Sequence, residues 1–353
     1  MQILAVGGGY TSAPVTAPTS LSNVPSPTSV AISFTAPSNN GGVAITNYEY
    51  SFNNSTWTAL SPADATSPIT ISGLTENTAY NVYLRAVNII GSGPASSATS
   101  FTTTRNPISI DVFVVGGGAG GSGGFYPQGG GGGGGGGAQT TTMSLGAGTY
   151  TATVGGGGGA GANASIGPSG AGSSFYTLSA GAGTGGSTVG RGGNSGNGYS
   201  GGSNASSTAG GGAGAFGNGG AAVDGNPCRP GNGGTGATNA YRTGGNEQFA
   251  GGGGGSVRNQ ASIVAGTGLG VYGGGNGCQF NLGSGFNATY YGGGGGGGVN
   301  YNAASGAAGY QGIVVIRYLT SAAAYFTISG GSVNTYGSYT SRTFTGTSNL
   351  VIS

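Results

Sequence analysis

Few residues of this chain could take part in acid–base, nucleophilic or metal chemistry. The 353 residues include no His, and all eight basic residues are Arg. The six acids stand singly, at Glu49, Asp64, Glu76, Asp111, Asp224 and Glu247. Zinc sites, catalytic triads and carboxylate dyads need His, clustered Cys or paired acids. The sequence therefore predicts a protein that is not an enzyme and holds no metal or cofactor.

The two cysteines, Cys228 and Cys278, leave two alternatives open. They could form a disulfide, but two cysteines separated by this much sequence are equally compatible with thiols.

One glycine pattern has the spacing of a nucleotide-binding motif. Residues 116–121 satisfy G-x-G-x-x-G and follow an apolar stretch. A dinucleotide site also needs a helix, whose N-terminus meets the pyrophosphate. Glycine dominates the next residues, up to 137, and cannot sustain a helix. A phosphate-binding loop of the Lys-containing type is excluded because the chain has no Lys.

Aromatic side chains interrupt the glycine-rich part of the chain and could bind sugars. Aromatic faces can stack on sugar rings while Arg, Asn and Gln donate hydrogen bonds. The candidates for receptor binding are Phe125, Tyr126, Tyr199, Tyr241, Arg242, Tyr290 and Tyr291. The alternative is that the rings cap the ends and edges of a folded glycine core, where they exclude water.

The charge distribution argues against two kinds of partner. A net charge of +2 is spread thinly along the chain, whereas nucleic-acid and anionic-membrane surfaces need clustered basic residues. No stretch approaches the roughly 18–20 apolar residues of a membrane span. Residues 1–9 lack the features of a secretory signal, which suggests another export route, a lost leader or release by lysis.

Glycine divides the chain into dissimilar parts, since 76 of the 88 glycines lie within residues 108–318. We expect an N-terminal strand and linker at 1–14 and a β-rich domain at 15–104. A glycine-rich domain at 108–318 and a C-terminal β-hairpin region at 319–353 would follow. The predicted fold class is all-β.

Residues 15–104 show the two-residue alternation and regular turns of a β-sandwich. Leu74 precedes Tyr80 by six residues, and the alternating Val82, Leu84 and Ala86 follow. This pattern resembles the fibronectin type III family. The resemblance implies a sandwich in which Tyr80 forms the tyrosine corner. It says little about function, because such modules occur mostly as spacers and surface decorations.

The glycine-rich part is framed by apolar, β-branched stretches at 108–115, 148–154 and 312–318, which predict strands. A flexible linker is the usual fate of polyglycine. The alternative is a bundle of extended polyglycine II-type helices, with three residues per turn, whose backbones satisfy one another. The framing strands favour the bundle. Collagen is excluded because a strict three-residue glycine repeat and high proline content are absent.

A three-residue repeat should separate the faces of each helix. Positions 190, 193 and 196 are all Gly, whereas 191, 194 and 197 are polar. Positions 211, 214, 217 and 220 are also Gly, and in 231–240 small and polar residues alternate with the same period. The uninterrupted glycine runs at 129–137, 251–255 and 292–298 should lie in the interior of the bundle.

The framing strands, the polyglycine runs and Gly172-Ser-Ser-Phe175 resemble the glycine-rich domain of tailed-phage fibre proteins and related surface proteins. Residues 331–352 resemble the β-hairpin that accompanies such domains. This resemblance implies a virion fibre or surface-appendage protein that attaches to a host surface. Its partners would be a host glycan or outer-membrane component, other virion or filament proteins, and further copies of itself. The implied location is the virion surface, or alternatively the extracellular space or cell surface.

Two other functions stay open at this point. The chain could be a purely structural virion or filament subunit, because both termini look strand-like (3–6 and 349–353) and could pair between subunits. It could also be a bacterial cell-surface or matrix protein.

Overall fold

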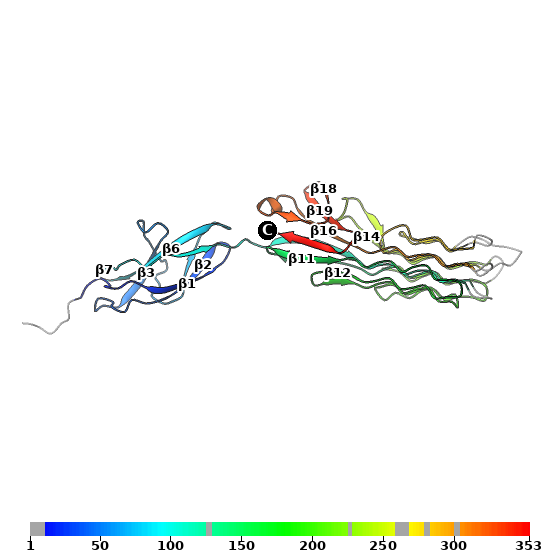
Figure 1. The fold of residues 1–353 in the computed structure, drawn as a ribbon, viewed down its shortest axis with the longest axis horizontal. Helices are drawn as coiled ribbons and strands as arrows, with labels where there is room; N and C mark the ends of the chain where they lie inside the picture. The colour runs from blue at the N-terminus through cyan, green and yellow to red at the C-terminus, as the bar shows by residue number, and fades with distance from the viewer. Residues whose placement is uncertain (1–10, 125–128, 225–227, 258–267, 279–282, 300–303) are drawn as a thin grey trace, which may run out of the picture. The chain divides into compact units, whose positions relative to one another are not determined.

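The computed structural model describes residues 11–124, 129–224, 228–257, 268–278, 283–299 and 304–353 (Figure 1). The chain divides into two compact units, Met1–Asn106 and Pro107–Ser353. Both are built from β-strands, as predicted, and the described residues include one short 3₁₀ helix, η1 (Ala322–Tyr325).

The first unit is a sandwich of two antiparallel sheets. One sheet has the order β1-β2-β5, and the other has the order β4-β3-β6-β7, with β8 also paired to β6. The strands are β1 (Thr19–Pro25), β2 (Ser29–Thr35), β3 (Ile45–Ser51), β4 (Thr58–Ala59), β5 (Ile69–Ser72), β6 (Ala79–Asn88), β7 (Gly91–Ser92) and β8 (Thr99–Thr102). Alternate residues of β6, among them Val82 and Leu84, are fully buried in the core. The Thr75 N–H donates to Tyr80 Oη at 3.0 Å, which is the tyrosine corner expected from the sequence.

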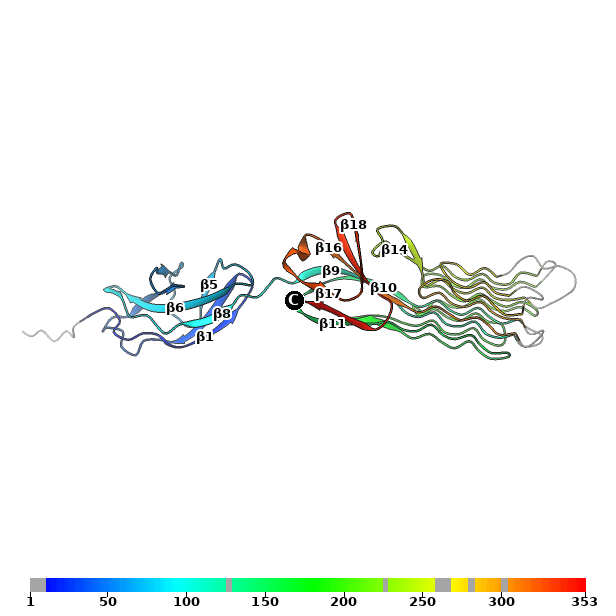
Figure 2. The same cartoon turned by 45° about the horizontal axis from the view of Figure 1, so that its top comes forward.

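The second unit contains two five-stranded antiparallel sheets, with the orders β10-β9-β16-β19-β18 and β13-β12-β11-β20-β17 (Figure 2). The strands of the first are β9 (Ile108–Val115), β10 (Ala138–Leu145), β16 (Ile313–Leu319), β18 (Ser332–Tyr336) and β19 (Tyr339–Phe344). Those of the second are β11 (Gly148–Thr153), β12 (Ser173–Phe175), β13 (Leu178–Ala180), β17 (Ile328–Ser329) and β20 (Ser348–Ile352). A separate hairpin joins β14 (Ala237–Asn239) to β15 (Glu247–Phe249).

The second half of strand β9, residues 112–115, is buried on both faces, and all four of these residues are apolar. Val112 and Val114 pack toward the second sheet, in one core with Phe175 and Leu350. The opposite face of β9 packs in a second core, where the Phe113 ring meets the Phe249 ring of β15 edge-on at 5.0 Å. The β14–β15 hairpin therefore covers the outer face of the first sheet.

The C-terminal residues expected as a separate region belong to the second unit. Strands β18 and β19 do form a hairpin, whose turn contains Gly337 at φ +54°. However, β19 also pairs with β16, and β20 pairs with β11 and β17. The strand-like C-terminus is thus paired within its own chain. Residues 3–6, the other strand-like terminus, lie outside the described residues.

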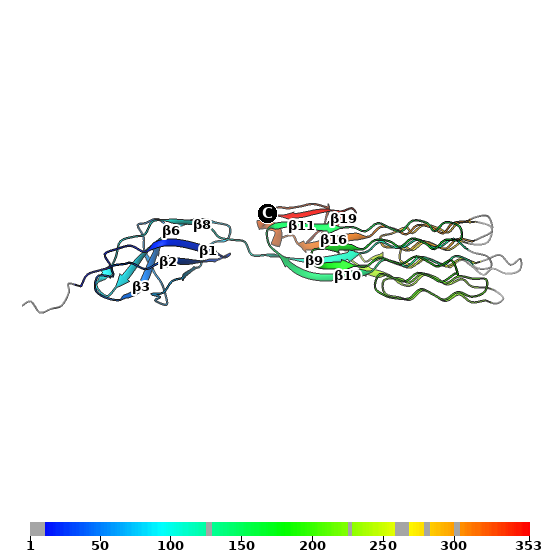
Figure 3. The same cartoon turned by 60° about the horizontal axis from the view of Figure 1, so that its bottom comes forward.

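The glycine segments continue from the strands as extended helices that lie side by side (Figure 3). Successive amides of the segment after β9 donate to three different neighbours: Gly116 to Gly137 O, Gly117 to Ala171 O and Gly118 to Tyr310 O. The next three amides repeat the order with Gly134, Pro168 and Ala307. A shift of three residues thus returns to the same neighbour, which is the geometry of the predicted polyglycine II-type bundle.

The uninterrupted glycine runs lie in the interior of this bundle, as predicted. Every residue of 129–137, 251–255 and 292–298 is buried. A Cβ atom on Gly134 would lie 2.0 Å from the Asn194 carbonyl oxygen, and one on Gly294 would lie 2.1 Å from the Gly133 oxygen. Only glycine allows backbones to approach so closely.

The predicted faces also appear on the outer helices. Gly193 is buried while Arg191 and Asn194 are exposed. Gly231, Gly234 and Ala237 are likewise buried, and the polar residues 232, 235 and 238 are exposed. The series 211, 214, 217 and 220 does not form one face, because the chain reverses at a tight turn from Gly214 to Gly217.

Candidate functional site

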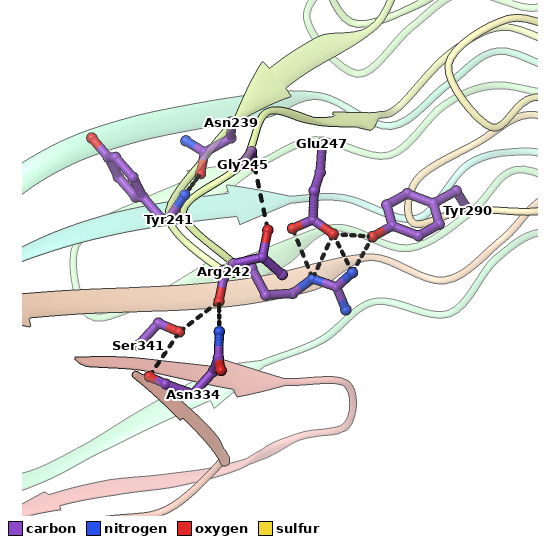
Figure 4. Close-up of polar contacts among 9 residues, drawn as sticks. Asn239, Tyr241, Arg242, Gly245, Glu247, Tyr290, Asn334 and Ser341 are labelled. Carbon is purple, nitrogen blue, oxygen red and sulfur yellow. Dashed lines mark hydrogen bonds and ion pairs between the residues drawn. The ribbon is translucent and has the colours of Figure 1, made fainter. Parts of the chain in front are cut away.

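The structure brings four of the seven receptor-binding candidates together. Arg242, in the turn of the β14–β15 hairpin, contacts Tyr290 and Tyr291, and Tyr241 packs against the same core. Figure 4 shows Tyr241, Arg242 and Tyr290. Tyr199 is 37% exposed, and its own backbone amide donates to Ser195 Oγ. Among the described residues, no contact joins Tyr199 to this cluster of four residues. Phe125 and Tyr126 lie outside the described residues.

Arg242 and Tyr290 share one carboxylate, that of Glu247. The Arg242 Nε donates to Glu247 Oε1 and Oε2 at 3.1 and 3.0 Å, and an Nη atom forms a close ion pair with the same carboxylate. Tyr290 Oη accepts a hydrogen bond from Arg242 and donates one of 2.6 Å to Glu247 Oε1. Each polar group in this triad therefore has a partner within the protein.

The electrostatics of the triad are those of a stable ion pair. Burial raises the pKa of the Tyr290 hydroxyl well above its ordinary value, and the bond to Glu247 raises it further. Burial also acts to raise the pKa of Glu247, but hydrogen bonds from Arg242 and Tyr290 outweigh it and lower that pKa. At neutral pH the carboxylate is ionised and the tyrosine is a neutral donor.

The turn that carries Tyr241 and Arg242 is fastened to the β18–β19 hairpin. The Arg242 carbonyl accepts hydrogen bonds from Asn334 Nδ2 at 2.9 Å and Ser341 Oγ at 2.8 Å. Tyr336 Oη donates to the Tyr241 carbonyl at 2.5 Å. These contacts join elements about 95 residues apart in sequence, so they hold the two hairpins together.

The aromatic rings of the cluster extend the core beneath them. Tyr290 lies 5.4 Å from Phe249 and 5.1 Å from Tyr291 between ring centroids, and Tyr291 lies 5.5 Å from Tyr310. The Arg242 guanidinium lies 5.5 and 5.7 Å from the Tyr290 and Tyr291 rings. Tyr290 and Tyr291 thus pack against the side-chain core below them, and their binding to a receptor stays a prediction.

Sequence reasoning overlooked the residues that pair with this cluster. Arg317 of β16 stands opposite Asp111 of β9, and the two form an ion pair at 2.6 Å. The Arg317 guanidinium also lies 4.0 Å from the Tyr241 ring and 4.4 Å from the Tyr339 ring. The sequence does contain a sign of this pair, because Asp111 and Arg317 each stand alone within an apolar stretch. Charged residues in such strands usually have a partner of opposite charge.

A second group of exposed residues marks turns of the bundle that lie away from the sheets. Gly123, eight residues beyond the end of β9, donates to Ser165 O, and the preceding Ser122 hydroxyl donates to Ser187 O. Three large apolar side chains lie in or next to these two turns and a third turn near them. Ile166, Val189 and Val223 are 65%, 52% and 56% exposed.

The neighbouring turn is ordered by one carboxylate. Asp224 accepts hydrogen bonds from the Ser206 and Ser207 amides at 2.5 and 3.1 Å, and from the Ser207 hydroxyl. The Ser207 hydroxyl also lies 3.7 Å from the Cys228 sulfur. Cys278 is buried, and no bond joins the two sulfurs in this structure.

Neither a metal-binding cluster nor a membrane-spanning helix occurs among the described residues. They contain no group of three or more Cys, Asp or Glu side chains placed to hold a metal ion. Within the same residues, no helix is long and apolar enough to cross a membrane.

Comparison with known proteins identifies both parts of the chain. The model of the glycine-rich domain matches residues 94–319, and that of the fibronectin type III domain matches residues 16–102. No curated protein matches the chain. Among solved structures, a crystal structure of titin domains and a structure of titin kinase with its flanking domains are each 24% identical over 26% of this chain. The matches cover 32% and 18% of those chains with a TM-score of 0.23, so they carry no argument.

Proposed function

We propose, from the premise that this chain belongs to the glycine-rich domain family and also carries a fibronectin type III domain, that it is a virion fibre or surface-appendage protein. The two domains together indicate a surface or structural protein. The narrower proposal is that the glycine-rich domain attaches the particle to a host surface. The virion surface is the location that this function requires.

The observation that carries the proposal is the contrast between the inside of the bundle and its turns. Inside, backbone groups of glycine segments hydrogen-bond to one another, and every residue of the uninterrupted runs is buried. At the turns, Ile166, Val189 and Val223 expose more than half of their surface. Exposed apolar side chains gathered on one part of a protein often mark an interaction site. A rigid bundle would hold such turns in one conformation, so that little conformational entropy would be lost on binding.

The test is binding of the full-length protein to intact bacterial cells from a panel of strains and to outer-membrane preparations from them. We expect binding to one or more strains. The triple variant Ile166→Ser, Val189→Ser, Val223→Ser should reduce that binding at least about tenfold, since each lost apolar contact contributes of the order of 1 kcal/mol. Val333→Ser is the matched control, because Val333 is 57% exposed on β18 and should not affect binding.

A purely structural subunit is the second candidate, and the Arg242 cluster favours it. Four residues predicted to contact a receptor also join two hairpins and the core of their own chain, which supports a structural role for them. A bacterial cell-surface or matrix protein would have the same architecture. Absence of binding to every strain and membrane fraction would contradict attachment and leave the structural role.

A further inference from the structure

A groove with a volume of about 330 Å³ runs between the edge strand β10 and strand β14 of the second unit. Its floor consists of the buried apolar side chains Phe113, Ala138 and Ala237. Its walls are Gln139, Thr140, Phe216 and Thr238. The volume lies at the lower end of the range of small-molecule sites, about 300–1,000 Å³.

Phe216 is held firmly in this groove although its side chain is 53% exposed. It stands in the tight turn between Gly214 and Gly217, and its amide donates to the Thr235 carbonyl at 3.0 Å. The preceding Ala215 amide donates to the Ala250 carbonyl at 2.9 Å. The backbone on which the exposed ring stands is therefore fixed by two neighbouring segments. Such an anchor limits the entropy lost when a ligand packs against the ring.

The polar walls are also ordered. The Asn197 side chain bridges the two sides of the groove, because its Nδ2 donates to the carbonyls of Ala138 and Ala215. Its Oδ1 accepts from the Ala138 amide at 3.2 Å and from Gln139 Nε2 at 3.4 Å. The groove lining, all of it among the described residues, contains no charged side chain.

We propose that this groove binds a neutral pyranose ring of a surface oligosaccharide. The negative face of an aromatic ring is complementary to the C–H face of a sugar. The hydroxyls of Thr140, which shares a face of the first sheet with Phe113, and of Thr238 can exchange hydrogen bonds with the hydroxyls of the sugar. An apolar peptide side chain would cover these polar groups without pairing them, which is unfavourable. An acidic sugar would lack a basic partner.

The inference deepens the proposed attachment to a host surface and depends on it. It assigns sugar recognition to a side of the bundle next to the sheets, whereas the exposed apolar turns lie away from them. The two sites can therefore be inactivated separately.

The experiment is binding of the full-length protein to an array of neutral and acidic oligosaccharides, followed by saturation-transfer NMR with the neutral oligosaccharides that bind. Phe216→Ala should weaken neutral-oligosaccharide binding at least about tenfold, and Phe216→Leu should weaken it comparably while keeping apolar bulk. The control is Phe286→Ala, because Phe286 is 51% exposed and does not line the groove. Thr140→Val should also weaken binding, because it removes a hydroxyl that lines the groove.

Four results would overturn the inference. Three of them are no sugar bound by the wild-type protein, binding only of acidic sugars, and equal binding by Phe216→Leu and wild type. In each case, binding of the same preparation to bacterial cells decides the proposed function separately. Cell binding without sugar binding would contradict the groove as a sugar site and would still support attachment to the host surface. A loss of sugar binding in Phe286→Ala equal to that in Phe216→Ala would also contradict the assigned site.

Discussion

At the scale of single residues, two kinds of contact hold the second unit together. Glycine allows one backbone to lie directly against another, and ion pairs join Arg317 to Asp111 of a neighbouring strand and Arg242 to Glu247 within the β14–β15 hairpin. The two differ in tolerance. A glycine in the bundle meets backbone atoms that have little freedom to move, whereas Arg242 and Glu247 are long side chains that can adjust. Substitution of an interior glycine should therefore cost more stability than loss of one ion pair.

Neighbouring glycines on one segment provide the sharpest test of this difference. A Cβ atom on Gly158 would lie 2.0 Å from the Pro168 carbonyl oxygen, whereas one on Gly159 would meet no atom within 4 Å. We expect Gly158→Ala to lower the free energy of unfolding by about 1–3 kcal/mol or more. Gly159→Ala should be neutral or stabilising by up to about 1 kcal/mol, since it restricts the unfolded chain. Denaturant titration measures both, and equal losses would contradict close backbone packing.

The Glu247 triad should make the stability of the second unit depend on pH. The pKa of Glu247 is lowered in the folded protein from its ordinary 4.5. Its contribution is therefore present above about pH 4.5 and is lost as the pH falls through the lowered folded-state pKa. Glu247→Gln should destabilise the unit by about 1 kcal/mol at neutral pH. The difference from wild type should shrink on acidification.

A set of unfolding curves from pH 7 to pH 3 measures this difference. Glu76→Gln is a suitable control, because its carboxylate lies in the first unit and accepts from Asn106 there. A Glu247→Gln difference that stayed constant with pH would show that charge is not the source of the stabilisation.

At the scale of elements, the glycine helices and the strands form one continuous framework. Gly116 follows directly after β9, and Gly137 directly precedes β10. The hydrogen bonds of the two segments continue where the strand pairing stops, as the Gly116 amide bonds to the Gly137 carbonyl. The sheets thus fix the register at one end of the bundle. Such a framework protects amides over the whole length of an interior helix.

Amide hydrogen exchange should reveal this protection. The Gly133 and Gly134 amides donate to Gly295 O at 2.7 Å and Thr184 O at 3.0 Å. The Gly159 amide lies on an exposed face and has no backbone acceptor among the described residues. We expect exchange at Gly133 and Gly134 to be at least about a hundredfold slower than at Gly159. Random-coil rates at Gly133 and Gly134 would contradict an ordered bundle.

The elements that the sequence predicted correctly are those governed by local pattern. Strands β9, β11 and β16 follow from β-branched apolar runs, and the glycine faces follow from a period of only three residues. Strands β10 and β14 were not predicted, because Thr-rich or three-residue strands depend on their partners. The functional assignment of Arg242 and Tyr290 was an expectation from loop position alone. Their pairing spans 48 residues, and no local pattern encodes such a contact.

At the scale of the whole molecule, the chain joins two units with different kinds of core. The first unit buries alternating apolar side chains between two sheets. The second combines a side-chain core between its sheets with a glycine bundle stabilised largely through its backbone. Because each unit has its own core, we expect two separate unfolding transitions rather than one.

The single tryptophan of the chain allows the two transitions to be told apart. Trp57 lies in the first unit, with the Arg85 guanidinium 4.3 Å from its ring. Its fluorescence should therefore change only when the first unit unfolds, while calorimetry detects both transitions. Gly158→Ala should lower the temperature of one calorimetric transition by several degrees and leave the fluorescence midpoint unchanged. If that variant moved both midpoints together, the two units would unfold as one, and the fibronectin type III domain would stabilise the bundle instead of only carrying it.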